Sequence, residues 1–251
     1  MPIHVYGASH VGKVRKNNED TFWYAKLPSA EHCQFAMVSD GVGGKDYGEI
    51  ASDTAKQVFQ EIVNDNKLAH AVDETTRTAM LDMSARRAHQ EIAKLGQQNK
   101  DYAGMACTLI AVLADPNCVG WVNVGDSRLY HYSQSSLTQV SADQTIAQTM
   151  LNDGRIKKED LATHPDRNTL LYCLGVEAIN QPIAPDSNLL NWQVGDKLLL
   201  CSDGLSDMVN SEGIARFLEN NPQNATERLI EAALEAGGKD NITVIILENS
   251  A

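Results

Sequence analysis

The sequence lacks the features that mark several common classes of protein. No apolar run approaches the length needed to cross a bilayer, and residues 109–114 are typical of the longest runs. The N-terminal residues do not join a basic region to an apolar one, as a secretory signal does. There is no internal repeat, low-complexity tract or linker rich in proline and serine. These absences predict a cytoplasmic protein with a single domain over residues 1–251.

The chain has few cysteines, and its basic residues are fewer than its acidic ones. The five cysteines are odd in number, and none stands in a Cys-x-x-Cys spacing. We therefore expect buried, reduced thiols rather than disulfides or a zinc site. Lysine and arginine together number 21 against 33 aspartates and glutamates, which gives a formal net charge of -12. This charge disfavours direct binding to nucleic acid or to an anionic membrane surface.

The hydrophobic pattern predicts a mixture of strands and helices. Apolar stripes at spacings of three and four predict a helix from residue 47 and a second one across residues 81–95, with Asp73 and Glu74 near its start. Shorter helical patterns occupy residues 214–218 and 229–234, and one at 146–151 lies in a polar insertion. Predicted strands cover residues 3–9, 35–39, 107–113, 119–124, 128–132, 137–140, 197–201 and 242–247. The short connections favour antiparallel pairing, in two sheets with helices packed outside.

A glycine-rich loop, VSDGVGGKDYG at residues 38–48, connects a predicted strand to a predicted helix. Such loops often bind phosphate through backbone N–H groups. The dinucleotide spacing fails because Asp46 replaces the third glycine, and the Walker spacing fails because Asp46 also follows Lys45. A tight turn with positive φ accounts for the glycines. Asp40 is the residue that this interpretation leaves unexplained.

Asp40 is one of several carboxylates that stand beside predicted strand ends. The others are Glu19, Asp20, Asp126, Asp203 and Asp240. Each alone is most often a turn or cap residue. Together they predict a cluster whose mutual repulsion a divalent cation relieves, and an all-oxygen donor set favours Mg²⁺ or Mn²⁺ over zinc or copper. Two such ions can activate water for attack on phosphorus, and the planar fork of Arg15 suits phosphate oxygens.

With these residues in place, the sequence resembles the metal-dependent protein phosphatases, the protein phosphatase 2C class, and its stand-alone bacterial Ser/Thr members in particular. The matching segments run from about Gly7 to Leu247 and read RKNNED, VSDGVGG, VGDSRLY, HPDRNTLLYCLG, LLLCSDGLSDMV and GGKDNITVI. The resemblance implies an α+β fold, with a central sandwich of two mainly antiparallel β-sheets flanked by α-helices in four αββα layers. It implies a mobile flap, for which residues 143–181 are the candidate. It also implies hydrolysis of phosphoserine and phosphothreonine in proteins with Mn²⁺ or Mg²⁺.

The resemblance assigns the core metal ligands residue by residue. Asp40 corresponds to the carboxylate that bridges two core ions, and Gly41 to the carbonyl ligand beside it. Asp203 and Asp240 correspond to the other core aspartates. Glu19 corresponds to the acidic ligand of the first motif, which acts directly or through water.

The remaining assignments surround this core. Asp20 corresponds to a neighbour that supports the metal-bound water, and Asp126 to the residue that holds a third, weaker ion with Asp203. Arg15 corresponds to the phosphate-binding arginine. Asn241 follows the last ligand and is expected to orient it. The implied catalytic residues are therefore Arg15, Asp20 and Asp40.

The chain departs from the family pattern in three places. Val42 stands where many eukaryotic members carry a histidine proposed as general acid, so the leaving group must take its proton from a metal-bound water or another group. His164 is a weak candidate for that role, and a structural role in the flap is favoured. Residues 143–145 read Asp-Gln-Thr where the family often has Asp-His-Ser. Residues 106–108 read Ala-Cys-Thr in place of Gly-Thr-Thr, which we interpret as a change in strand packing.

The predicted mechanism is direct hydrolysis by a water that bridges two ions, without a phosphoenzyme. Ser202 lacks a Gly-x-Ser-x-Gly elbow, and Cys201 lacks the Cys-x₅-Arg spacing because Asp207 occupies the arginine position, so neither is expected as nucleophile. Two alternatives stay open: a non-catalytic sensor of phosphoproteins on the same fold, and a structural acidic domain that binds Ca²⁺. The implied partners of a monomeric enzyme are phosphorylated proteins and a cognate eukaryotic-like Ser/Thr kinase.

Overall fold

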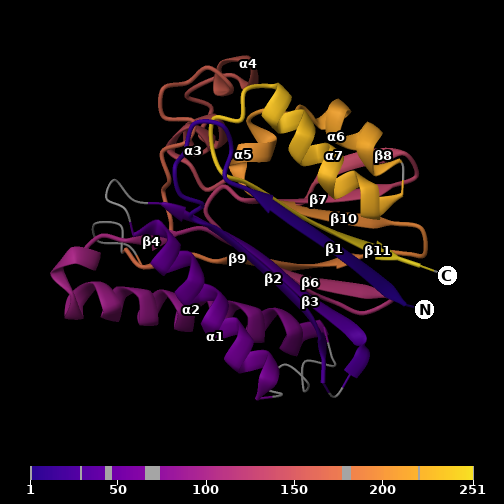
Figure 1. The fold of residues 1–251 in the computed structure, drawn as a ribbon, viewed down its shortest axis with the longest axis horizontal. Helices are drawn as coiled ribbons and strands as arrows, with labels where there is room; N and C mark the ends of the chain where they lie inside the picture. Colours follow the sequence, from indigo (N-terminus) through magenta and orange to yellow (C-terminus); the bar gives the residue numbers. More distant parts are fainter. Residues whose placement is uncertain are drawn as a thin grey trace.

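Two antiparallel β-sheets packed face to face form the centre of the computed structural model, which describes residues 2–28, 30–42, 47–65, 74–176, 182–219 and 221–250 (Figure 1). The first sheet has the order β1-β11-β10-β7-β8 and the second the order β2-β3-β5-β6-β9, with β4 paired to β3. The strands of the first sheet are β1 (Ile3–His10), β11 (Ile242–Asn249), β10 (Lys197–Cys201), β7 (Arg128–Ser133) and β8 (Ser136–Gln139). Those of the second are β2 (Asp20–Leu27), β3 (Ala30–Val42), β4 (Ala106–Cys107), β5 (Leu109–Ala114), β6 (Cys118–Val124) and β9 (Asp186–Asn191).

Helices cover the outer face of each sheet (Figure 1). The second sheet is covered by α1 (Gly48–Asn64) and α2 (Glu74–Gln98), which is followed by the 3₁₀ turn η2 (Lys100–Tyr102). The first sheet is covered by α5 (Asp203–Ser206), α6 (Ser211–Leu218) and α7 (Pro222–Glu235). Two further short helices, α3 (Ile146–Asn152) and α4 (Lys158–Leu161), lie beside α5 at one end of the sandwich. The predicted α+β sandwich in four layers is confirmed.

Three layers of apolar side chains explain why this arrangement forms. In β3, Phe35 and Met37 pack against the helices of the second sheet, and Ala36 and Val38 pack between the sheets. A strand buried on both faces has a continuous apolar run instead of alternation, which is the pattern of this stretch. In β10 the same division places Leu199 under the helices of the first sheet.

The predicted elements are present with some changes of extent. The strand expected at residues 35–39 is the middle of the longer β3, and the apolar stripe of Ala51, Ala55, Val58 and Ile62 is the buried face of α1. The expected helix at 146–151 is α3. Five elements, β2, β9, α4, α5 and η2, were not predicted. Gly43, Gly44, Lys45 and Asp46 of the glycine-rich loop, and Asp73 before α2, lie outside the described residues.

The cysteines and the helices test two further expectations, buried reduced thiols and the lack of a segment long enough to cross a bilayer. All five cysteines are free thiols, and Cys33, Cys107, Cys118 and Cys201 are buried, as predicted. Burial raises the pKa of the Cys201 and Cys107 thiols to about 12, which keeps both protonated at neutral pH. In the part of the chain that the structure describes, no helix has the length and apolar character needed to span a membrane.

Candidate functional site

The carboxylates singled out in the sequence come together at one end of the sandwich, where strands of both sheets end. Asp20 opens β2 and Asp40 lies near the end of β3, both in the second sheet. Asp203 opens α5 directly after β10, and Asp240 precedes β11, both in the first sheet. Asp126 stands in the turn between β6 and β7, where the chain passes from one sheet to the other. The site is therefore built between the two sheets.

Asp20 and Asp40 are paired residues of two neighbouring strands. Their Cα atoms are partners in the register of β2 and β3. The Asp20 carboxylate accepts a hydrogen bond from Ser202 Oγ at 2.7 Å, and its Oδ1 is buried without a hydrogen-bond partner. Burial raises the pKa of Asp20 to about 6, the charge of Asp240 adds to the shift, and hydrogen bonds from neighbouring hydroxyls oppose it.

Asp40 is held by Thr108 and surrounded by like charge. Its backbone N–H donates to Thr108 Oγ1 at 3.0 Å, and its carbonyl accepts from the Thr108 N–H at 2.8 Å. Burial raises the pKa of Asp40 well above its usual value. The charges of Asp20, Asp203, Asp126 and Asp240 raise it further. The Thr108 hydroxyl also hydrogen-bonds Ser127 Oγ at 2.6 Å, which connects the Asp40 strand to the turn that carries Asp126.

Asp203 and Asp126 form a second like-charge pair on the side of the site next to α3. Burial raises the pKa of Asp203 to about 7, with Asp207, Asp240 and Asp20 as charges that add to it. Its Oδ1 is buried without a hydrogen-bond partner. Burial also raises the pKa of Asp126 well above its usual value, and the nearby charge of Asp203 is the next cause.

Glycines permit the close backbone contacts that hold these segments together. The Gly41 N–H donates to the Glu19 carbonyl at 3.1 Å, and a Cβ at Gly41 would overlap the backbone of Gly48 at the start of α1. A Cβ at Gly204 would likewise overlap the carbonyl oxygen of Asn241. Each of these glycines stands beside a carboxylate of the site, so the packing requires glycine where the carboxylates converge.

Asn241 fixes the N-terminal loop that carries Glu19 and Arg15. Its Oδ1 accepts from the Glu19 N–H at 2.8 Å, and its Nδ2 donates to the carbonyls of Val11 and Asn17, both at 2.9 Å. Arg15 Nη2 reaches Asp240 Oδ2 at 2.7 Å, and the Arg15 side chain is 53% exposed. The guanidinium therefore lies beside the carboxylates with donors left over, because one carboxylate oxygen uses only part of its fork.

The donor set fits a divalent cation. Buried carboxylate oxygens without partners on Asp20 and Asp203, and carboxylates that raise one another's pKa, describe a site that positive charge would stabilise. All donors are oxygens, as Mn²⁺ and Mg²⁺ prefer. Among the described residues, no group of three or more His, Cys, Asp or Glu side chains is arranged so that it could hold a metal ion as it stands. The carboxylates of the site therefore fit an ion by their chemistry, although they do not form a closed ligand group in the described residues.

The positions that depart from the family pattern have structural roles here. Gln144 Oε1 accepts from the Gly125 N–H at 3.0 Å and its Nε2 donates to the Ala184 carbonyl at 2.9 Å, so it anchors the turn before Asp126. His164 Nδ1 accepts from the Asp166 N–H at 3.1 Å within its own turn. Val42 pairs with Ala106 at the end of β3.

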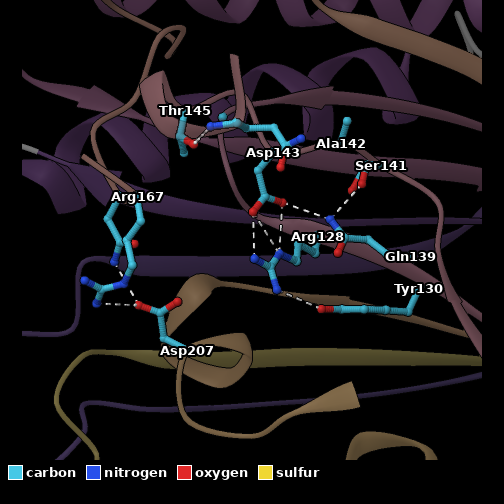
Figure 2. Close-up of polar contacts among 12 residues, drawn as sticks. Arg128, Tyr130, Gln139, Ser141, Ala142, Asp143, Thr145, Arg167 and Asp207 are labelled. Carbon is cyan, nitrogen blue, oxygen red and sulfur yellow. Dashed lines mark hydrogen bonds and ion pairs between the residues drawn. The ribbon is translucent and has the colours of Figure 1, made fainter. Parts of the chain in front are cut away.

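A cavity of about 420 Å³ opens next to Asp126 and Asp203, between α5 and the segment that carries α3 and α4. Arg128 lies in its wall and forms a two-pronged ion pair with Asp143, with Nη2 at 2.6 Å from Oδ2 and Nε at 2.9 Å from Oδ1 (Figure 2). Arg167 and Asp207 face each other across the opposite part of the cleft, with Nη2 at 3.5 Å from Oδ2 (Figure 2). We call this cavity the flap cleft.

Comparison with known proteins identifies the family to which the chain belongs. The family model described as protein phosphatase 2C matches residues 6–236. The chain belongs to the protein phosphatase 2C family. It is 34% identical over 238 residues to the serine/threonine protein phosphatase PstP of Mycobacterium tuberculosis, a match that covers 94% of this chain and 43% of PstP. It is 31% identical over 239 residues to the serine/threonine phosphatase Stp of Listeria monocytogenes, covering 94% of this chain and 92% of Stp.

A solved member of the family shares the fold and is itself described with bound metal. The catalytic domain of PstP, described as a complex with two manganese ions, has a TM-score of 0.83 and 32% identity, over 98% of this chain and 97% of that one. The chain thus spans less than half of full-length PstP but nearly all of its catalytic domain. The hydroxyl residues Ser202, Thr108 and Ser127, which support the carboxylates here, were not identified as site residues from the sequence.

Proposed function

We propose that the chain is a metal-dependent protein serine/threonine phosphatase that hydrolyses phosphoserine and phosphothreonine in proteins. The observation that carries the proposal is the convergence of Asp20, Asp40, Asp203 and Asp240 from two sheets, with buried carboxylate oxygens that lack partners and Arg15 beside them. The relatives named serine/threonine phosphatases support the substrate class. The manganese complex of the PstP catalytic domain supports the metal.

The proposed metal ligands are the residues around this convergence: Glu19, Asp40, Gly41, Asp126, Asp203 and Asp240. Two core ions of Mn²⁺ or Mg²⁺, with a third near Asp126, would supply an acidified water and positive charge for attack at phosphorus. Asp40 lies close enough to the other carboxylates that the charges of Asp20, Asp203, Asp126 and Asp240 all raise its pKa. The Thr108 hydroxyl fixes the backbone of Asp40, and Asn241 fixes that of Glu19.

Arg15 and Asp20 complete the proposed catalytic group. The ion pair with Asp240 holds the Arg15 guanidinium at the site, and its remaining N–H donors are free to bind phosphate oxygens in the planar, two-pronged way that arginine favours. Asp20, held by Ser202, is placed to accept a proton from a water in the site. No side chain is needed as nucleophile when water attacks, and the nearby Cys201 and Ser202 are both fully buried.

The proposal also covers the extent of the catalytic domain, its substrates and partner, and its cellular location. Residues 1–251 are proposed to act as one catalytic domain, and residues 143–181 as its flap. The substrates are phosphorylated proteins, and a Ser/Thr protein kinase would supply them. The enzyme would act in the cytoplasm as a monomer. These statements rest on family membership and on the described fold.

The test is Mn²⁺-dependent phosphate release from a phosphothreonine peptide, with Asp40→Asn as the inactive variant. Asp82→Asn on α2 is a matched control, because Asp82 is an aspartate paired with Arg86 on the helical layer. We expect release by the unsubstituted chain and by Asp82→Asn, and none after EDTA treatment or in Asp40→Asn. Tight binding of the peptide without release would instead assign the chain to the non-catalytic sensors.

A further inference from the structure

The flap cleft has two chemically different ends. Asp126 and Asp203 line the end that belongs to the carboxylate site. The remainder is lined by residues from three other segments, which include Lys158 of α4, Arg167 and Lys239. All three of these basic side chains are exposed. A cleft that leads away from the site of phosphate hydrolysis thus gathers positive charge from separate parts of the chain.

Away from Asp126 and Asp203, the charged side chains that line the flap cleft leave a surplus of positive charge. Arg128 is neutralised by Asp143, as Figure 2 shows, and Asp207 is shared between Arg167 and the amide of Asn168, which donates to it at 2.8 Å. Lys158 and Lys239 have no ion-pair or hydrogen-bond partner among the described residues. The chain has a net charge of -12, so acidic side chains outnumber basic ones over the molecule as a whole. Two lysines without an acidic partner at one cavity therefore differ from the rest of the chain.

A further polar group in the flap cleft lacks a partner. Ser206 lines the cavity, and its Oγ is enclosed by the protein without a hydrogen-bond partner. A buried hydroxyl without a partner loses the hydrogen bonds that it would make in water, so a rotation of the side chain that lets it donate to a ligand gains an interaction. The hydroxyl and the two lysine ammonium groups are all donors, which is the chemistry that binds carboxylate or phosphate oxygens.

We propose that the flap cleft binds an anionic side chain of the substrate, a carboxylate or a second phosphate, near the phosphorylated residue. This inference rests on the proposed phosphatase function and adds a substrate preference to it. An extended peptide advances about 3.3 Å per residue, so a residue within three positions of the phosphorylated one can lie in a cleft that adjoins the carboxylate site. The enzyme would therefore prefer acidic or multiply phosphorylated segments over neutral ones.

The test measures kcat/KM for phosphothreonine peptides at saturating Mn²⁺. One peptide is neutral. Each of the others carries one glutamate or one phosphoserine at a single position, from three residues before to three residues after the phosphothreonine. The readout is the kcat/KM of each anionic peptide divided by the kcat/KM of the neutral peptide. For the unsubstituted chain we expect a ratio of roughly two to five for each exposed lysine that the anion contacts. The ratio should decrease as salt is added, since screening weakens exposed ion pairs. The glutamate and phosphoserine arms show which anion the cleft prefers.

Variants locate the effect. Lys158→Gln and Lys239→Gln should each lower the ratio toward one, because each removes a positive charge from the flap cleft. Lys26→Gln, an exposed lysine near the far end of β2, makes the same change in net charge and should keep the ratio of the unsubstituted chain. A ratio near one at every position in an active enzyme, or a ratio unaffected by both cleft substitutions, would overturn this inference. Cleavage of the neutral peptide would then still uphold the phosphatase itself, whereas its absence with all peptides would refute the proposed function.

Discussion

Asp20 and Asp40 lie directly opposite each other on adjacent strands, with carboxylates that would both be ionised in water. Like charges that face each other across a strand pair destabilise a sheet. Here the Asp20 side chain is buried and that of Asp40 is half-buried, so loss of contact with water raises the pKa of both carboxylates, and the charge of Asp20 raises the pKa of Asp40 further. The β2–β3 hairpin therefore keeps an unfavourable pair at its end, which the cation of the proposed function would stabilise.

Metal binding should stabilise the folded chain strongly. Mn²⁺ at a hundredfold excess over its dissociation constant contributes about 2.7 kcal/mol, which for a chain of this size raises Tm by about 5–10 °C. Asp203→Asn removes a proposed ligand and should show less than half of that shift in differential scanning fluorimetry. Asp82→Asn should show the full shift. Equal shifts in Asp203→Asn and the unsubstituted chain would contradict the assignment of Asp203.

The metal-free chain should lose stability as pH rises. The folded state holds protons on Asp20 and Asp203 with pKa values of about 6 and about 7, above the usual 3.8, so it binds more protons than the unfolded state between about pH 4 and pH 7. The free energy of unfolding in EDTA should therefore be greater at pH 5 than at pH 8, as urea titrations can measure. Saturating Mn²⁺ should remove or reverse this slope, because the ion competes with those protons.

Arg15 should matter for its shape as well as its charge. Arg15→Ala removes donors aimed at phosphate oxygens and should lower kcat by about 10²–10³, the usual loss for a donor that stabilises transition-state charge. Arg15→Lys keeps the charge but loses the planar fork, so it should recover only part of the rate. Arg87→Ala is a suitable control, since Arg87 also pairs with a carboxylate, that of Glu61 at 2.6 Å, on the helical layer. Full activity in Arg15→Ala would refute the proposed role.

The Thr108 hydroxyl should link fold stability to metal affinity. Thr108→Val keeps the shape but leaves the Asp40 N–H and Ser127 without their partner, which should cost about 1–3 kcal/mol of unfolding free energy. We expect weaker Mn²⁺ binding in isothermal titration, and recovery in Thr108→Ser. Thr226→Val on α7 removes another buried hydroxyl and should lower stability without any change in Mn²⁺ affinity. Matching Mn²⁺ affinities in both valine variants would contradict the link.

Sequence patterns predicted the buried elements better than the edge ones. α1 and β3 have apolar periodicity that burial enforces, so both were found. β2 was missed although Phe22, Trp23 and Tyr24 favour strands, because most of its side chains are half exposed and give no clean alternation. β9 is a polar edge strand, and α5 has too few residues for a helical period to show.

The carboxylates of the site were recognisable from sequence because each stands beside a glycine or a strand end. The hydroxyls that hold them were not. Ser202 reaches Asp20 across 182 positions, and Thr108 reaches Asp40 across 68. Serine and threonine within strands carry no pattern that distinguishes a supporting hydroxyl from any other buried one, so only the fold reveals these contacts. Whether each carboxylate binds metal stays a prediction.

The contact between Arg15 and Asp240 joins positions 225 residues apart, and β11 lies between β1 and β10 in its sheet. A growing polypeptide that has not yet supplied β11 has neither Asp240 nor the Asn241 side chain that fixes Glu19. During synthesis the chain therefore cannot complete the proposed site until β11 has left the ribosome. A truncated product that ends before β11 would therefore lack part of the proposed site.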